Sequence, residues 1–152
     1  MRGIAVALVR TFDADHVGRI ANHRDVRPGT LATGPLDVSA VVSSPANFCL
    51  FDRWGGFVFE AKSPRIYEVH TLFIPEGRGS HALAAAREAL QYMFALTDCR
   101  RIETFCSHSN KAAKWLALKC KFQKIDAESV LGHAGDRYAL DHDRWVKEIL
   151  CH

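Results

Sequence analysis

The residues best suited to chemistry lie at a junction between two predicted elements, where a glycine-bearing loop separates a strand from a helix. The strand is expected to end at Ile74, and the helix to begin near Ser80. The first N–H groups of a helix have no intrahelical partners and lie at the positive end of its dipole, so such a junction can bind an anion, most often phosphate. Gly77 and Gly79 would allow close approach of a ligand, and Arg78 adds a permanent charge. The loop therefore predicts a phosphate site, with a simple tight turn as the alternative.

The elements that must position this loop predict an α/β domain. Short β-rich runs joined by turns that contain Gly or Pro are typical of antiparallel strands. The strands before and after the long helix are joined by a crossover, so we expect them to be parallel. The expected fold is a mixed central sheet, an antiparallel meander plus a parallel crossover, with helices on both faces. The predicted strands are 4–9, 47–52, 57–61, 66–74, 101–106 and 137–140, and the predicted helices begin near Asp13, Asp37, Ser80 and Asn110.

Length and composition fit one globular domain. The chain has 152 residues, of which 48% are hydrophobic and 24% are charged, and its formal net charge is +3. A chain of this size can bury a complete core, so we expect a single domain over residues 1–152. The small and dispersed positive charge argues against a nucleic-acid partner, and no apolar run is long enough to span a membrane. These features predict a soluble, cytoplasmic protein.

The cysteines are expected to be buried thiols in a reducing compartment. The chain has five of them, an odd number, and no two have the Cys-x-x-Cys spacing. The alternative is a zinc site built from Cys99, Cys106, His108 and Cys120. This set lacks the short paired spacing of structural zinc ligands, so we expect no metal centre.

The loop and the following helix resemble the first motif of the GNAT superfamily of acyl-CoA-dependent N-acyltransferases. That motif is a strand followed by V-x-P-x-x-[QR]-G-x-G-x-[GA], which opens the helix that holds the coenzyme A pyrophosphate. The segment F-I-P-E-G-R-G-S-H-A-L aligns with it, with matches at Pro75, Arg78 and Gly79. His81 and Leu83 stand where the motif has small residues. The resemblance implies a GNAT-like fold and a bound acyl-CoA.

A second segment resembles the family's strand followed by N-x-x-A-x-x-F-Y-x-K-x-G-F. Matches occur at Asn110, Ala113, Lys119 and Phe122. The Tyr of this motif often protonates the departing thiolate, and its place is taken here by Ala117. Motifs with such departures are similar to those of some phage-encoded members of the superfamily.

By this resemblance the acyl donor is acetyl-CoA and the acceptor is an amine. Main-chain amides at the start of the helix would bind the pyrophosphate, and an N–H near Phe73 or Ile74 would stabilise the oxyanion. Asn110 would brace the cofactor, cap its own helix, or do both. The implied cofactor-binding residues are Phe73, Ile74, Arg78, Gly79, Ser80, His81, Ala82, Leu83 and Asn110.

The resemblance also implies a general base on the strand before the loop, because an amine cation must lose a proton before it attacks the thioester. Glu68 and His70 lie two residues apart and therefore on one face of that strand. His70 is nearer the loop, and histidines titrate near neutral pH. We expect His70 to be the base, with Glu68 orienting it or acting through water. The structural alternative is that Glu68 pairs with an arginine and His70 is a hydrogen-bonded strand residue.

Two functions from different classes remain open. The first is an N-acetyltransferase that moves an acetyl group from coenzyme A to a primary amine. The alternative is a catalytically inactive GNAT-fold protein that serves in interaction or assembly, of phage origin, as a homo-oligomer or with a protein partner. The matches in the loop and at Asn110 favour the first. The departures at Ala117, His81 and Leu83 favour the second.

Overall fold

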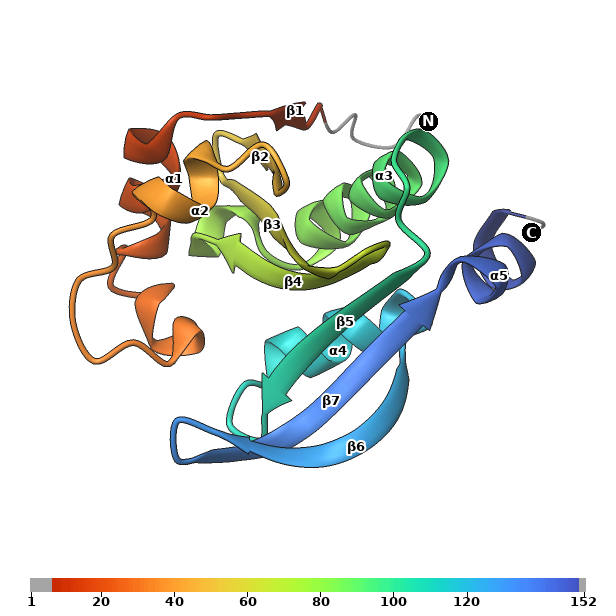
Figure 1. The fold of residues 1–152 in the computed structure, drawn as a ribbon. Coiled ribbons are helices and arrows are strands. Elements are labelled where there is room, and N and C mark those ends of the chain that lie inside the picture. Colours follow the sequence, from red (N-terminus) through yellow and green to blue (C-terminus); the bar gives the residue numbers. More distant parts are fainter. Residues whose placement is uncertain (1–6, 151–152) are drawn as a thin grey trace.

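The computed structural model describes residues 7–150 and contains one mixed β-sheet (Figure 1). Its strands are β1 (Val9–Arg10), β2 (Phe48–Asp52), β3 (Gly55–Ser63), β4 (Ile66–Phe73), β5 (Arg101–Ser107), β6 (Gln123–Val130) and β7 (His133–Asp141). They lie in the order β1-β2-β3-β4-β5-β7-β6. Neighbouring strands are antiparallel except β4 and β5, which are parallel and joined by a crossover helix. The predicted fold class is therefore confirmed.

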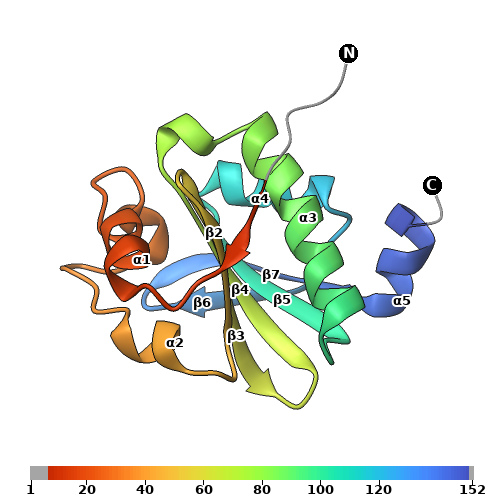
Figure 2. The ribbon, with the colours of Figure 1, turned by 90° about the horizontal axis from the view of Figure 1, so that it is seen from above.

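Helices cover both faces of the sheet (Figure 2). The helices are α1 (Ala14–Ala21), α2 (Ser39–Ser43), α3 (Ser80–Leu96), α4 (Lys111–Lys119) and α5 (His142–Trp145), with 3₁₀ turns at Arg27–Thr30 and Pro75–Gly77 and a π-helical turn at Val146–Leu150. α1 and α2 pack on one face, whereas α3 and α4 pack on the other. Among the residues that the structure describes, no helix has the length and apolar character needed to cross a membrane.

Alternation along the central strands gives the molecule one apolar core on each face of the sheet. Val69 and Phe73 of β4 join the larger core with α3 and α4. Leu72 lies between these two residues in the sequence and points to the other face, where it joins the smaller core with Val17 of α1. Successive side chains of a strand point to opposite faces, so a strand covered on both sides is apolar at nearly every position.

The predicted helix starts agree with the structure. Asp13 caps α1, and its Oδ1 accepts from the N–H groups of Asp15 (3.0 Å) and His16 (3.2 Å). Asp37 lies two residues before the first residue of α2, one before the N-cap position Val38, and its Oδ1 accepts from the Ser39 N–H (3.0 Å). Short side-chain acceptors at these positions satisfy N–H groups that a helix leaves unpaired.

The differences from prediction lie at the two ends of the chain. Residues 4–6 of the predicted strand 4–9 fall outside the described residues. Residues 7 and 8 are not in a strand, and Val9 belongs to β1. The C-terminal region contains α5, which is not among the predicted elements. The buried ring of Trp145 holds this short helix against α3, with its centroid 5.3 Å from that of Phe94. One helical turn is too short to show a period in the sequence, which explains the omission.

β4 and β5 separate after a short parallel ladder. The last paired residues are Glu68 and Glu103. Just beyond them, Thr104 Oγ1 donates to the carbonyl of Val69 (3.1 Å). From there β4 continues beside β3, whereas β5 continues beside β7, so the two strands diverge (Figure 1).

Candidate cofactor site

A pocket of about 320 Å³ opens where β4 and β5 diverge. Its walls come from β4, the start of α3, the start of α4 and the loop after α1, which are far apart in the sequence. Ile74, Ser80, His81 and Leu83 adjoin the pocket in sequence but are not among its lining residues. The predicted cofactor-binding residues that line it are Phe73, Arg78, Gly79, Ala82 and Asn110.

The N-terminus of α3 opens at this pocket without a side-chain cap. The first bond of the helix runs from Leu83 N–H to the Gly79 carbonyl (3.0 Å). The N–H groups of Ser80, His81 and Ala82 therefore have no intrahelical partner. Gly79 has a φ of 73°, and a Cβ placed on it would meet nothing within 4 Å. The conformation favours glycine, and the open space leaves the amides accessible to an anion.

Arg78 adds a positive charge to the pocket. Its Nε donates to the carbonyl of Phe73 (3.1 Å), and its Nη2 donates to the carbonyl of Asp25. These bonds join the loop before α3 to the end of β4 and to the loop after α1. Within residues 7–150 no carboxylate forms an ion pair with Arg78, so its charge is available to a bound anion.

Gly77 and the His81 side chain pack against the turn between β2 and β3. A Cβ on Gly77 would lie 2.6 Å from Cβ of Trp54, so glycine is required there by the Trp54 side chain. The prediction that Gly77 admits a ligand is therefore wrong. His81 Nε2 lies 2.7 Å from Asp52 Oδ2, and Asp52 Oδ1 accepts from the N–H groups of Trp54 and Gly55. The His81 side chain is thus directed to the turn, and only its main chain belongs to the helix start.

Main-chain groups at the end of β4 point alternately toward β3 and toward the pocket. The Ile74 N–H donates to the Trp54 carbonyl (3.0 Å), on the β3 side. N–H groups alternate in direction along a strand, so that of Phe73 points to the side that β5 has left. Of the two amides implied as oxyanion donors, the one from Phe73 is directed to the pocket.

Asn110 caps α4 at the wall of the pocket. Its Oδ1 accepts from the Ala113 N–H (3.0 Å), as an N-cap side chain does. A Cβ placed on Gly29 would lie 3.3 Å from Asn110 Nδ2, so the amide also borders the loop after α1. The capping role expected from the sequence is present. Asn110 also lies in the pocket wall, where it could brace a cofactor as the resemblance implies.

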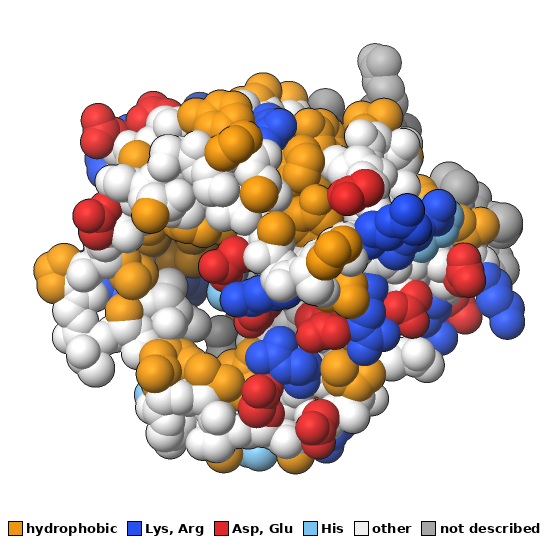
Figure 3. All heavy atoms as spheres, in the orientation of Figure 1, with side chains coloured by type: hydrophobic (Ala, Val, Ile, Leu, Met, Phe, Trp, Pro, Cys, Tyr) orange, Lys and Arg blue, Asp and Glu red, His pale blue; other side chains and the backbone are white. Residues whose placement is uncertain are grey.

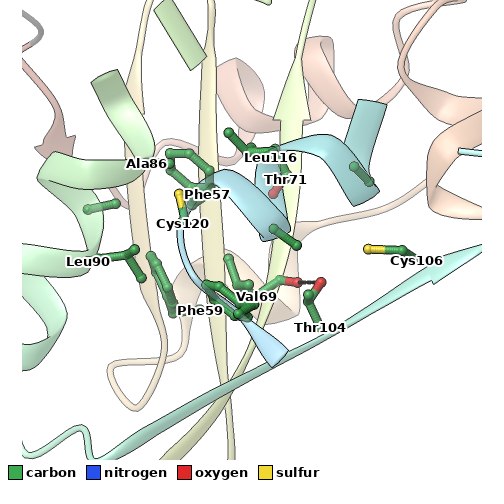
Figure 4. Close-up of a pocket in the computed structure, with 14 residues that line it drawn as sticks. Phe57, Phe59, Val69, Thr71, Ala86, Leu90, Thr104, Cys106, Leu116 and Cys120 are labelled. Atoms are coloured by element: carbon green, nitrogen blue, oxygen red, sulfur yellow. Dashed lines mark hydrogen bonds between the residues drawn. The ribbon is translucent and has the colours of Figure 1, made fainter. Parts of the chain in front are cut away.

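A smaller cavity of about 40 Å³ adjoins the pocket on the side of the core. Figure 4 shows the side chains that line it. Thr71, Ala113 and Leu116 line both spaces. The cavity lies between α3, α4 and the strands β3, β4 and β5, and Ala117 forms part of its wall. Alanines at helical spacing on α3 and α4 could have indicated this cavity from the sequence, but the same pattern is typical of closely packed helices.

Glu68 and His70 lie on the face of β4 opposite to both cavities, and they share that face as predicted. Figure 3 shows this face, with acidic and basic side chains around a hollow below β4. His70 Nε2 is 3.2 Å from Glu60 Oε1, and its side chain is 45% exposed. Glu68 lies 3.5 Å from Lys62 Nζ and 3.7 Å from Arg137 Nη1. These contacts are the ones that the structural alternative describes, and the exposed ring remains accessible to a substrate.

The carboxylates of Glu60 and Glu68 hold an ammonium group between them. Lys62 Nζ lies 3.3 Å from Glu60 Oε1 and 3.5 Å from Glu68 Oε1. Burial opposes ionisation of Glu60, but hydrogen bonds from His70 and Lys62 and their charges outweigh it, so the pKa of Glu60 is lowered. Glu60 therefore remains a carboxylate that can orient the His70 ring near neutral pH.

The zinc set considered from the sequence does not assemble. Within the described part of the chain, the three possible ligand side chains that approach within 4.8 Å of one another are Glu60, Glu68 and His70. Burial raises the pKa of the Cys99 thiol to about 12, so it stays protonated at neutral pH. The expected burial is confirmed for Cys49, Cys99, Cys106 and Cys120, and Cys151 lies outside the described residues.

Solved structures supply the comparison, since no family model and no curated protein matches this chain. It is similar to the spermidine N-acetyltransferase from Vibrio cholerae in complex with CoA and spermine, with a TM-score of 0.76 over 92% of this chain and 97% of the other, at 16% identity. It is also similar to a GNAT-family acetyltransferase from Bacillus anthracis, with a TM-score of 0.66 over 88% and 92%, at 20% identity. This chain has the GNAT acetyltransferase fold.

Within the GNAT fold, the departures from the sequence motifs have visible structural roles. His81 contacts Asp52, and Leu83 packs against the larger core. Ala117 leaves the inner cavity open. None of these side chains removes an N–H group from the first turn of α3. The departures therefore leave the main-chain N–H groups at the start of α3 unchanged.

Proposed function

We propose that this chain is an N-acetyltransferase that takes an acyl group from acetyl-CoA and transfers it to a primary amine. The observation that carries the proposal is the pocket between β4 and β5, onto which the uncapped start of α3 and Arg78 both open. Coenzyme A has phosphates at one end and a thin chain at the other. This pocket has Arg78 and the uncapped start of α3 at one end and an apolar space at the other, which suits such a ligand. The CoA bound by the Vibrio cholerae neighbour supports the same reading.

In this proposal the start of α3 holds the pyrophosphate. The N–H groups of Ser80, His81 and Ala82 donate to its oxygens, and Arg78 contributes its charge. Main-chain donors do not depend on side-chain size, so His81 can replace the glycine of the motif. Asn110 borders the bound cofactor from the opposite wall.

His70 is proposed to take the proton from the acceptor ammonium, directly or through water, with Glu68 acting through water and Glu60 orienting the ring. The amine nitrogen then attacks the thioester carbon, and the N–H of Phe73 stabilises the oxyanion that forms. When the C–S bond breaks, the electrons go to sulfur and coenzyme A leaves as a thiolate. The nitrogen becomes cationic as it attacks and releases its second proton to water as the amide forms. Alanine at position 117 cannot protonate the thiolate, so the thiolate takes its proton from water.

The acidic pair on this face supports an amine as the acceptor. Glu60 and Glu68 already accommodate the ammonium group of Lys62 at 3.3 and 3.5 Å. The neighbour from Vibrio cholerae acts on spermidine and was solved with spermine. We extend to this chain only the class of acceptor, a primary amine.

The second candidate is a GNAT-fold protein that serves in interaction or assembly without catalysis. Alanine at position 117 favours it, because a general acid contributes roughly 10²–10⁴ in rate. The Vibrio cholerae neighbour has a dodecameric structure, and we propose that this chain also self-associates. Sedimentation velocity would measure that state directly.

Thermal unfolding with and without acetyl-CoA, combined with thiol release, separates these functions. A ligand at 100 times its dissociation constant adds about 2.7 kcal/mol of stability. An enzyme is expected to show a raised Tm and to release free thiol when an amine such as spermidine is added. Pantetheine, which lacks the nucleotide, serves as a control for the contact with α3. A raised Tm without thiol release would favour the second candidate, and no shift at millimolar acetyl-CoA would exclude the enzyme.

A further inference from the structure

The inner cavity is suited to an apolar guest. Its hydroxyl groups come from Thr71 and Thr104, and Thr104 Oγ1 already donates to the Val69 carbonyl (3.1 Å). Figure 4 shows aromatic, aliphatic and thiol side chains around the remaining wall. The Thr71 main chain also faces this side of β4, so water can hydrogen-bond at that edge, but most of the wall offers it no partner. An apolar group that displaces poorly bonded water from such a space gains affinity.

Its size corresponds to a few carbon atoms. The cavity has about 40 Å³, whereas one water needs roughly 10–15 Å³ by the same measure. The space exists because alanines line it from both helices, Ala86 and Ala89 on α3 and Ala113 and Ala117 on α4. A larger side chain at any of these positions would fill it.

The cavity is also the inner end of the route through the pocket. Thr71, Ala113 and Leu116 belong to both spaces, and Thr71 is exposed although it lies on an interior strand of the sheet. A long ligand anchored at Arg78 and the start of α3 therefore meets the cavity with its far end. That end must be short and apolar.

We infer that the inner cavity binds the terminal carbons of an acyl chain longer than acetyl, so that propionyl-CoA and butyryl-CoA are better ligands than acetyl-CoA. The inference rests on the proposed function and extends its acyl donor from acetyl-CoA to longer, still short-chain, acyl-CoAs. The thioester carbon remains in the pocket beside the Phe73 amide, and the extra methylene groups enter the cavity between Ala86 and Ala117.

Calorimetric titration of the full chain with CoA and with acetyl-, propionyl-, butyryl- and octanoyl-CoA tests it. Each buried methylene is expected to raise the affinity about fourfold, so butyryl-CoA should bind roughly fifteenfold more tightly than acetyl-CoA. Octanoyl-CoA exceeds the available volume and should lose this gain. Transfer rates with the same donors should give the same order.

A filled cavity provides the matched variant. Ala86→Leu should abolish the preference for butyryl-CoA while binding of free CoA changes less than about twofold. Ala95→Leu makes the same change on an exposed position of α3 and should leave the whole series unchanged. Circular dichroism establishes that both variants fold, and if Ala86→Leu does not, the chain-length series of the unmodified protein decides alone.

The outcomes separate the inference from the proposed function. CoA binding with no gain from acetyl to butyryl, or a gain that Ala86→Leu preserves, would overturn the inference and leave the function standing. No binding of CoA or of any acyl-CoA would overturn both.

Discussion

Gly79 is the residue at which folding and binding can be separated. Its φ of 73° strains any other residue, so we expect Gly79→Ala and Gly79→Asp each to lower the free energy of unfolding by about 1–3 kcal/mol. Only Asp adds a negative charge where an anion is proposed to bind. Acyl-CoA should therefore bind about tenfold more weakly to Gly79→Asp than to Gly79→Ala, a difference of ~1.4 kcal/mol.

Urea unfolding measures the first effect and calorimetry the second. Because both variants share the backbone strain, the alanine variant is the control for it. Equal affinity of the folded aspartate variant and the unmodified chain would exclude this loop as the phosphate site.

His70 is the second residue with a decisive test. Its ring is half exposed, so His70→Ala should leave the Tm nearly unchanged. If it is the base, the rate of acetyl transfer should fall about 10²-fold, and the pH dependence between pH 6 and 9 should change. His133→Ala, at an exposed position on β7, is the control. Matching rates and pH profiles in His70→Ala and the unmodified chain would remove His70 from the mechanism.

The role of a site residue could be predicted where it depends on the main chain and the local motif. It could not be predicted where it depends on a contact with a residue far away in the sequence. Gly79 and the helix start follow from the loop itself. The His81 side chain bonds to Asp52, 29 residues earlier, and Gly77 faces Trp54. No spacing in the sequence indicates these contacts, because the sheet brings the β2–β3 turn to the loop.

At the scale of elements, the start of α4 tests whether Asn110 acts as a cap alone. Asn110→Ala should lower the free energy of unfolding by about 1 kcal/mol, whereas Asn110→Ser keeps an acceptor and should cost little. The affinity for acetyl-CoA of the Ser variant separates the two roles. An affinity equal to that of the unmodified chain would limit Asn110 to capping.

The pair of strands β3 and β4 should carry a pH-dependent part of the stability through Glu60. The pKa of Glu60 is lowered in the folded chain, so its stabilisation is present above the pKa of the unfolded chain and is lost as the pH falls through the folded value. Glu60→Gln should therefore be less stable than the unmodified chain at pH 7, and the difference should shrink below about pH 4. Urea unfolding at several pH values measures it. A difference that is constant with pH would contradict this assignment.

Most elements could be predicted from the sequence because each has its own period and its own turn. The meander and α3 follow from runs of apolar residues bounded by Gly or Pro, and Asp13 and Asn110 indicate helix starts. α5 could not be found this way, since its stability depends on the packing of Trp145 on Phe94 rather than on a local pattern.

At the scale of the whole molecule, the parallel crossover was predictable, but the order of the last strands was not inferred. β6 is almost entirely exposed, whereas β7 is buried at most of its central positions, which fits an edge strand beside an interior one. The polar sequence of β6 already indicates that this strand is exposed. The divergence of β4 and β5, by contrast, depends on β5 following β7, and no local signal reports it.

This divergence gives hydrogen exchange an unusual pattern on an interior strand. Interior strands normally exchange their amide protons slowly, because both neighbours protect them. In the second half of β4, Leu72 is paired with Gly56 on β3, whereas the N–H groups of Thr71 and Phe73 point to the side without a strand. Deuterium should therefore enter at alternate residues, rapidly at Thr71 and Phe73 and slowly at Leu72. Added CoA should slow the fast pair, and uniform slow exchange in the free protein would show that these amides are already bonded.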